Sequence, residues 1–299
     1  MAAISDPEVI TLATGRLSIG LVPEIGGSLA SFRFDGIEVM RALTDAERRA
    51  SNVLAVAMFP MVPYANRIAG NAFDFGGRTW RFAANNPPER FNVHGTGWHE
   101  PWVAEAGPEG TRLRLVHEAP GEPYSYEATQ TFALRPDALE VRLSLANRGA
   151  VAMPFGMGLH PWFDRDEDTE LQFSAAHFYM EGPEGVATER LATPPELDFS
   201  AGRRLPDSWR NNDYGGWSGG AVIRWPSRGL GLRLDADPLF GHLMLYADPE
   251  RSFFCLEPQS NAPTAFNRIA SGRDAGMGTV VLEPGETMAG AIRFTPFRL

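Results

Sequence analysis

The chain has a single cysteine, Cys255, among its 299 residues, so no intramolecular disulfide can form. Its neighbours Phe253, Phe254 and Leu256 indicate a buried, inert thiol. The cysteine content therefore gives no reason to expect an oxidising compartment. The sequence also lacks a basic segment followed by an apolar leader, and no apolar run approaches about 18 residues, so it predicts neither a signal peptide nor a membrane span. We expect a cytoplasmic protein.

Basic residues are in the minority. The chain has 27 Lys and Arg against 37 Asp and Glu, a net charge of −10. Nucleic-acid binding requires clustered Lys and Arg, and no such cluster occurs, so we expect no nucleic-acid partner. The sequence also has no glycine-rich phosphate loop and no Cys/His ligand cluster, so we expect no cofactor and no metal. A small neutral ligand fits this composition.

Helical periodicity is nearly absent. The one short candidate is the segment 44–50, with Thr44 or Asp45 as its N-cap. Period-2 alternation recurs instead, for example in the segment 138–146, where apolar and polar residues face opposite sides. Further strands are expected within 11–21 (two, around 14–16), 28–34, 37–40, 230–234 and 291–294. Spacing by Gly, Pro, Asn and Asp predicts an all-β fold, a large antiparallel β-sandwich. No linker or repeat divides the chain, so residues 1–299 are expected to form one domain.

Polar residues interrupt apolar or turn-forming segments at five places. In PMVPYANRIAGNAF, Asn66 and Arg67 could be a turn residue and a solvated cation, or Arg67 could present its donors to sugar or carboxylate oxygens. In FNVHGTGWHEPW, His94 precedes a glycine that permits close approach of a ligand. His99 follows, but the spacing spans glycines without a helix and supports zinc ligation only weakly.

The third place is GLHPWF, where His160 is followed by Pro, Trp162 and Phe; by itself it could be a buried structural histidine. The fourth is RNNDYGGW, where Asp213 could equally be a turn residue. The fifth is FFCLEPQSNAPTAFN, where Glu257 ends an apolar strand. Burial against that strand should raise its pKa toward the range of a general base. A structural ion pair between Glu257 and Arg67 is the alternative.

These segments together resemble the aldose 1-epimerase (mutarotase) family, which has a galactose-mutarotase-like β-supersandwich fold. The resemblance extends over almost the whole chain and follows the order in which that family carries its motifs. The segments are PYANRIAGNAF, NVHGTGW, GLHPWF, NNDYGGW, LEPQSNAPTAFN and the closing VVLEPGETMAGAIRF. Tyr often stands in the family where this chain has Trp162.

The resemblance implies an isomerase that interconverts the anomers of a monosaccharide without a cofactor. Glu257 would be the general base on the anomeric hydroxyl, and His160 the general acid on the ring oxygen. The substrate-binding residues implied are His94, Arg67, Asp213, Asn66, Gln259 and Trp162. The chemistry itself requires such a pair, because ring opening removes one proton and delivers another.

Three alternatives remain. A hexose-6-phosphate 1-epimerase would use the same pair with further basic residues, for which Arg90 and Arg268 are available. A non-catalytic sugar-binding module would have no need of both His160 and Glu257. A glycoside hydrolase would require paired carboxylates, and only Glu257 is well placed. The sequence does not distinguish a monomer from a homodimer, nor does it exclude Asp235, Asp237 or Asp248 as the sugar-binding aspartate.

Overall fold

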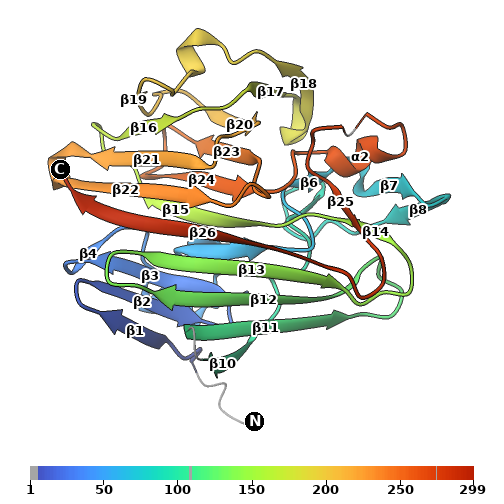
Figure 1. Cartoon of the computed structure of the whole chain (residues 1–299), viewed down its shortest axis with the longest axis horizontal. Helices are drawn as coiled ribbons and strands as arrows, with labels where there is room; N and C mark the ends of the chain where they lie inside the picture. Colours follow the sequence, from blue (N-terminus) through green and yellow to red (C-terminus); the bar gives the residue numbers. More distant parts are fainter. Residues whose placement is uncertain (1–5, 108–109, 274) are drawn as a thin grey trace.

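The computed structural model describes residues 6–107, 110–273 and 275–299. Within these residues, two large antiparallel sheets form the layers of a sandwich, accompanied by three short two-stranded pairings (Figure 1). The all-β antiparallel sandwich expected from the sequence is confirmed. No helix in the described part is long and apolar enough to cross a bilayer.

The larger sheet carries the candidate site. Its hydrogen-bonded order is β1-β2-β3-β5-β15-β24-β23-β20-β17-β18, with β4 added beside β3. The strands are β1 (Ile10–Thr14), β2 (Leu17–Val22), β3 (Ser28–Phe34), β4 (Ile37–Glu38), β5 (Met58–Met61), β15 (Gly158–Asp164), β17 (His177–Glu181), β18 (Ala187–Leu191), β20 (Arg210–Gly215), β23 (His242–Ala247) and β24 (Phe253–Gln259).

The second sheet has the order β10-β11-β12-β13-β26-β22-β21-β16-β19. Its strands are β10 (Val103–Gly107), β11 (Gly110–Glu118), β12 (Ser125–Leu134), β13 (Leu139–Asn147), β16 (Glu170–Phe173), β19 (Arg203–Arg204), β21 (Gly220–Trp225), β22 (Leu230–Ala236) and β26 (Thr287–Arg298). The short pairings join β6 (Arg67–Ile68) to β9 (Asn92–Val93), β7 (Ala72–Phe75) to β8 (Arg78–Arg81), and β14 (Met153–Phe155) to β25 (Val280–Leu282).

Helices are short in the described residues. The predicted helix is α1 (Asp45–Arg49), and Thr44 is its N-cap in a reciprocal capping box with Glu47. A second helix, α2 (Ala265–Ile269), has no such signal, because Thr264 makes no capping hydrogen bond. Single turns of 3-10 helix are η1 (Val53–Ala55), η2 (Ala69–Asn71), η3 (Pro183–Gly185), η4 (Pro195–Leu197) and η5 (Pro226–Arg228).

The alternating pattern of the strands builds the core between the sheets. In β13, Leu139, Val141, Leu143 and Leu145 are fully buried and belong to a hydrophobic cluster that contains side chains of both sheets. This shared core supports the proposal that residues 1–299 form one domain. In β24, by contrast, the residues that alternate with Phe254 and Leu256 belong to the opposite face of the sheet.

That opposite face of the larger sheet has a smaller apolar cluster of its own. It includes Phe59, Trp98, Trp162 and Cys255, all buried. Because side chains alternate along a strand, Cys255 and Glu257 share this face. The cluster therefore gives the candidate base an apolar floor on the side of the sheet away from the main core.

Candidate functional site

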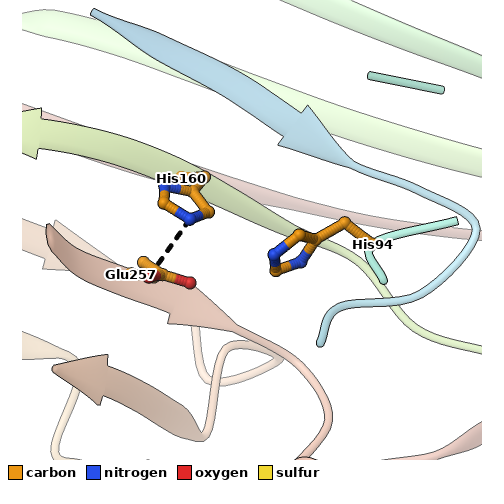
Figure 2. Close-up of side chains that lie close together, drawn as sticks. All are labelled: His94, His160 and Glu257. Atoms are coloured by element: carbon orange, nitrogen blue, oxygen red, sulfur yellow. Dashed lines mark ion pairs between the residues drawn. The ribbon is translucent and has the colours of Figure 1, made fainter. Parts of the chain in front are cut away.

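Strand pairing brings His160 and Glu257 together. Strand β15 pairs with β24, with Gly158 opposite Gln259 and Trp162 opposite Cys255. His160 and Glu257 lie midway between these two pairs and on the same face of the sheet. Nε2 of His160 is 3.3 Å from Oε1 of Glu257, and Figure 2 shows the two side chains pointing toward each other. The histidine and the carboxylate singled out from the sequence thus lie in direct contact.

The imidazole of His160 is held between aromatic rings. Phe59 stacks on it with ring centroids 4.5 Å apart, and Trp162 does so at 4.8 Å. The guanidinium of Arg41 lies 4.2 Å from the centre of a Trp162 ring. Ring packing therefore accounts for much of the contact surface of Trp162, which remains part of the cavity wall. Its principal structural effect is to fix the orientation of His160.

His94 enters the same site from a strained turn. Both His94 and Asn66 have left-handed backbone, with φ of 59° and 64°, a conformation that few residues other than glycine adopt. The two residues are joined by two hydrogen bonds: the His94 N–H donates to the Asn66 carbonyl at 3.0 Å, and the Asn66 N–H donates to Nδ1 of His94 at 3.0 Å. These bonds hold the His94 ring with its centroid 5.2 Å from that of His160 (Figure 2).

The residue after His94 must be a glycine. Gly95 also has positive φ, and a Cβ atom there would lie 2.3 Å from Cδ of Pro63 and 2.5 Å from the Val62 carbonyl oxygen. Real Cβ atoms do not approach a backbone so closely. The His-Gly motif is therefore explained by packing as well as by access for a ligand.

Burial sets the protonation of this site. It raises the pKa of Glu257 to about 8 and lowers the pKa of His160 to about 3, because each charged form loses its hydration. Burial likewise lowers the pKa of His94 well below its usual value. The neighbouring His160 lowers it further through electrostatic repulsion. The raised pKa expected for Glu257 is confirmed. At neutral pH, burial favours the uncharged forms of these three side chains.

The same three side chains could in principle hold a metal ion. One ligand atom from each of His94, His160 and Glu257 lies within 4.8 Å of the others. However, Nδ1 of His94 accepts the Asn66 N–H, so the neutral ring carries its proton on Nε2. A metal ligand needs a lone pair there. The donor set therefore fits a sugar oxygen better than a cation.

Arg67 lines the cavity and is held by an acidic partner. Its Nε and Nη2 donate to the two carboxylate oxygens of Glu89 at 3.1 and 2.8 Å. The sequence had left open a structural pair between Arg67 and Glu257, and the structure pairs Arg67 with Glu89 instead. Arg67 acts on Glu257 only through its charge, which opposes the rise in the Glu257 pKa. The pairing with Glu89 holds the guanidinium in one orientation at the cavity wall.

Asp213 and Gln259 do not lie where the resemblance implies. Neither lines the cavity. Asp213 is 1% exposed and accepts a hydrogen bond from Gln259 at 3.0 Å, and Nδ1 of His242 lies 2.8 Å from its other oxygen. The physical reason is that both carboxylate oxygens of Asp213 are already engaged below the surface, one by Gln259 and the other by His242. Direct contact of Asp213 or Gln259 with a sugar is therefore not supported.

A cavity of about 250 Å³ contains the remaining predicted residues. Glu257, His160, His94, Arg67, Asn66 and Trp162 all line it. Four further polar residues of its wall, Asn86, Glu89, Asn211 and Tyr246, were missed from the sequence. Asn211 lies two positions before Asp213 on β20, on the same face of the strand. The motif RNNDYGGW therefore identifies the correct strand but leaves open which polar residue reaches the cavity.

Several known proteins are similar to this chain in sequence and in fold. The family described as aldose 1-epimerase matches residues 8–295. The uncharacterized protein YphB of Escherichia coli K12 is 32% identical over 287 residues, covering 93% of this chain and 95% of YphB. The crystal structure of a candidate aldose 1-epimerase from Escherichia coli K12 has a TM-score of 0.89 and 30% identity, covering 98% and 99% of the two chains. The structure of galactose 1-epimerase from Lactobacillus acidophilus NCFM, at 16% identity, has a TM-score of 0.79, covering 97% and 94%. The expected galactose-mutarotase-like fold is confirmed.

Proposed function

Because the chain belongs to the aldose 1-epimerase family, we propose that it interconverts the α and β anomers of a free aldose. The observation that carries this proposal is the buried contact of 3.3 Å between His160 and Glu257 at the wall of a cavity. Anomer interconversion needs one group to take a proton and another to give one. A carboxylate and an imidazole at the same cavity wall can do both.

Ring opening is a balanced transfer of two protons. Glu257 takes the proton of the anomeric hydroxyl, and the C1–O1 bond becomes a carbonyl. The C1–O5 bond breaks, its electron pair passes to the ring oxygen, and His160 donates a proton there. Rotation about C1–C2 then presents the other face of the aldehyde, and the reverse transfers close the ring. His94, through the N–H on its Nε2, stabilises the negative charge that develops on the ring oxygen.

Burial of the pair favours the ring-opening direction of these transfers. Before opening, Glu257 is a carboxylate and His160 an imidazolium; afterwards both are uncharged. The high pKa of Glu257 and the low pKa of His160 both favour the uncharged forms. The pair reaches its starting state by moving one proton across the contact between the two side chains. The uncharged pair is thus the resting state of the empty site.

Other functions have less support at this site. A glycoside hydrolase needs two carboxylates beside the scissile bond, but Glu89, the second carboxylate of the cavity wall, is bound to Arg67. A hexose-6-phosphate epimerase needs basic residues for the phosphate. Of the two arginines available for that phosphate, Arg268 is engaged with the carbonyls of Ala187 and Thr188, and neither Arg268 nor Arg90 lines this cavity. Arg90 lines a neighbouring cavity instead. The neutral aldose is the better supported substrate.

Polarimetry tests the proposed reaction directly. The protein is expected to accelerate the change in optical rotation of at least one freshly dissolved α-aldose in a panel of glucose, galactose, xylose and arabinose. The buffer-catalysed rate, measured with heat-denatured protein, is the control. No acceleration with any of these sugars would contradict the proposal. Acceleration confined to the corresponding 6-phosphates would support the hexose-6-phosphate epimerase instead.

The pH dependence follows from the two pKa values of the pair. Between about pH 3 and pH 8 the pair carries one exchangeable proton, which the mechanism requires. We therefore expect kcat/KM to be level from about pH 5 to pH 7 and to fall tenfold per pH unit well above pH 8, where the pair loses its proton. Enzyme-catalysed rates corrected for buffer catalysis at each pH check this. A decline already complete at pH 6 would contradict the assignment.

A further inference from the structure

The turn that carries His94 is held from behind by the side chain of Asn85. Nδ2 of Asn85 donates to the carbonyl oxygens of Val93 and Gly95 at 2.9 and 2.7 Å, and its Oδ1 accepts the Val93 N–H at 2.9 Å. In the pair of β6 and β9, the His94 N–H points to the carbonyl of Asn66, so the N–H and carbonyl of Val93 point away from β6. The Asn85 amide therefore occupies the open edge of β9 as a neighbouring strand would.

A second asparagine holds the other half of the same contact. Nδ2 of Asn261 donates to the carbonyl oxygen of Ala65 at 3.0 Å, and its Oδ1 accepts the Ala65 N–H at 3.1 Å. Ala65 directly precedes Asn66, whose N–H donates to Nδ1 of His94. Asn261 is 1% exposed, and its Nδ2 also donates to the Ala262 carbonyl at 3.1 Å. The two turns that meet at His94 are thus each fixed by an asparagine that does not line the cavity.

The backbone that these hydrogen bonds restrain is strained. His94 and Asn66 both have positive φ, and such a conformation persists in residues other than glycine only where the surroundings impose it. Trp98 adds a restraint from a second direction, since its Nε1 donates to the same two carbonyl oxygens as Asn85, each at 3.1 Å. Loss of the Asn85 amide would remove the side-chain partner of the Val93 N–H and free the turn to relax.

The placement of the turn decides which nitrogen of His94 carries the proton. While the Asn66 N–H donates to Nδ1, that nitrogen needs a free lone pair, so the neutral ring holds its proton on Nε2. His94 lines the cavity beside His160 and Glu257 (Figure 2), where a proton on Nε2 is available to a substrate. If the turn relaxes and the Asn66 N–H moves away, the other tautomer becomes accessible. In that tautomer, Nε2 cannot donate to a ring oxygen.

We propose that Asn85 is a positioning residue of the reaction: it holds both neighbours of His94, against the turn that Asn261 fixes, and so keeps the His94 ring in the tautomer that donates from Nε2. This inference rests on the proposed function for the role of that donor, which stabilises negative charge on the ring oxygen. Asn85 does not line the cavity beside His160 and lines a separate cavity instead. It therefore acts on the substrate only through His94.

The kinetic experiment compares wild-type protein with Asn85→Ala and Asn85→Asp in the polarimetric assay. Alanine removes all three hydrogen bonds, whereas aspartate keeps the acceptor for the Val93 N–H and loses both donated bonds. Both variants should lower kcat by about ten- to a hundredfold, the size of a small misplacement of a catalytic group. KM should change little, because the His94 donor acts on charge that develops in the transition state. Asn85 is half-buried, so either variant can fold.

Asn147→Ala is the matched control. Nδ2 of Asn147 donates to the carbonyl oxygens of Val151 and Leu282 at 2.9 and 2.8 Å, and its Oδ1 accepts the Gly149 N–H at 2.8 Å. Asn147 thus makes the same three kinds of hydrogen bond, but it ends β13 in the second sheet and is only 1% exposed. Its replacement should lower the melting temperature at least as much as Asn85→Ala does and leave kcat unchanged.

Nitrogen NMR of protein that contains isotope-labelled histidine reads the His94 ring without any reaction. The chain has 6 histidines, and the signals of His94 are those that disappear in His94→Gln. Wild-type protein should show Nδ1 unprotonated and Nε2 protonated, and Asn147→Ala should show the same. Asn85→Ala should show the second tautomer as well, with the proton on Nδ1.

The two measurements distinguish the role of Asn85 from the proposed function. No catalysis by wild-type protein on any aldose, together with mixed His94 tautomers in Asn85→Ala, would overturn the proposed function and leave the hold of Asn85 on His94 standing. Catalysis by wild-type protein with an unchanged kcat in Asn85→Ala would overturn the inference alone. A single wild-type tautomer in Asn85→Ala, or an equal loss of kcat in Asn147→Ala, would also overturn it.

Discussion

Replacing Glu257 with glutamine is expected to lower kcat for anomer interconversion by about 10²–10⁴-fold, the usual contribution of a positioned acid or base. Glutamine keeps the size of the side chain and its place beside His160 but cannot accept the proton of the anomeric hydroxyl. Substrate binding should change little, because the hydroxyl can still hydrogen-bond to the amide. Polarimetric kcat and KM, measured separately, check this expectation.

The same substitution should not destabilise the fold at neutral or higher pH. Burial raises the pKa of folded Glu257 to about 8 from an ordinary value of 4.5. The unfolded chain therefore loses this proton at lower pH than the folded chain, and wild-type stability falls as pH rises from 4.5 through 8. Glutamine removes this dependence. Glu257→Gln should gain stability relative to wild type, on the order of 4 kcal/mol by pH 8.

Thermal unfolding at pH 5 and pH 8 measures this difference. The melting temperature of the variant should exceed that of wild type more at pH 8 than at pH 5. Glu118→Gln, at the exposed end of β11 in the other sheet, is the matched control and should change neither activity nor the pH dependence of melting. An active Glu257→Gln enzyme would contradict the mechanism, and a low melting temperature would show that the glutamate stabilises the fold.

Replacing His160 with asparagine is expected to lower kcat by a similar factor of about 10²–10⁴. The ring that donates the proton to the ring oxygen is lost, while His94 keeps its hydrogen bond to Asn66 and still reaches the substrate. His117→Asn is the matched control, because His117 is also buried and also faces a carboxylate, with Nδ1 2.6 Å from Glu100, but lies in the second sheet. That variant should keep full activity.

The two substitutions should not be additive. Each ring opening needs both proton transfers, so a site that lacks either group gains little from the other. The double variant of His160 and Glu257 should therefore be hardly slower than the slower single variant. If the two losses multiply, the residues act independently, and the paired mechanism is contradicted.

The alternation of apolar and polar residues along the chain predicts strands of both sheets. β3 begins and ends at the residues expected from the sequence, Ser28 and Phe34, and β13 at Leu139–Asn147 differs from the expected segment by one residue at each end. Alternation is strong there because one face of each strand is buried and the other is not. α2 was missed, because its five residues are too few for a helical period and Thr264 gives no cap. The order of strands in each sheet depends on contacts between distant segments, which periodicity does not contain.

The candidate site was predictable where one motif supplies both a strand and a side chain. Glu257 was expected at the end of an apolar strand, and the structure extends that strand, β24, to Gln259. His160 lies in β15, for which no strand was predicted. We expected Asp213, and not Asn211, to reach the cavity. Both residues are polar, and they lie two positions apart on the same face of β20, so the motif alone does not tell them apart. Glu89 comes from a segment with no recognisable motif, and only the folded chain brings it to the cavity.

Phe59 and Trp162 both stack on the His160 ring. This packing has a stereochemical consequence. A ring held between two aromatic side chains cannot swing from one side of a substrate to the other. His160 must therefore approach both anomers from the same direction. In the proposed mechanism, the part that turns over is the open-chain aldehyde, whose C1 carbonyl rotates. Because a catalyst changes rates and not equilibria, the ratio of anomers that such a reaction leaves behind is the one that water alone would reach.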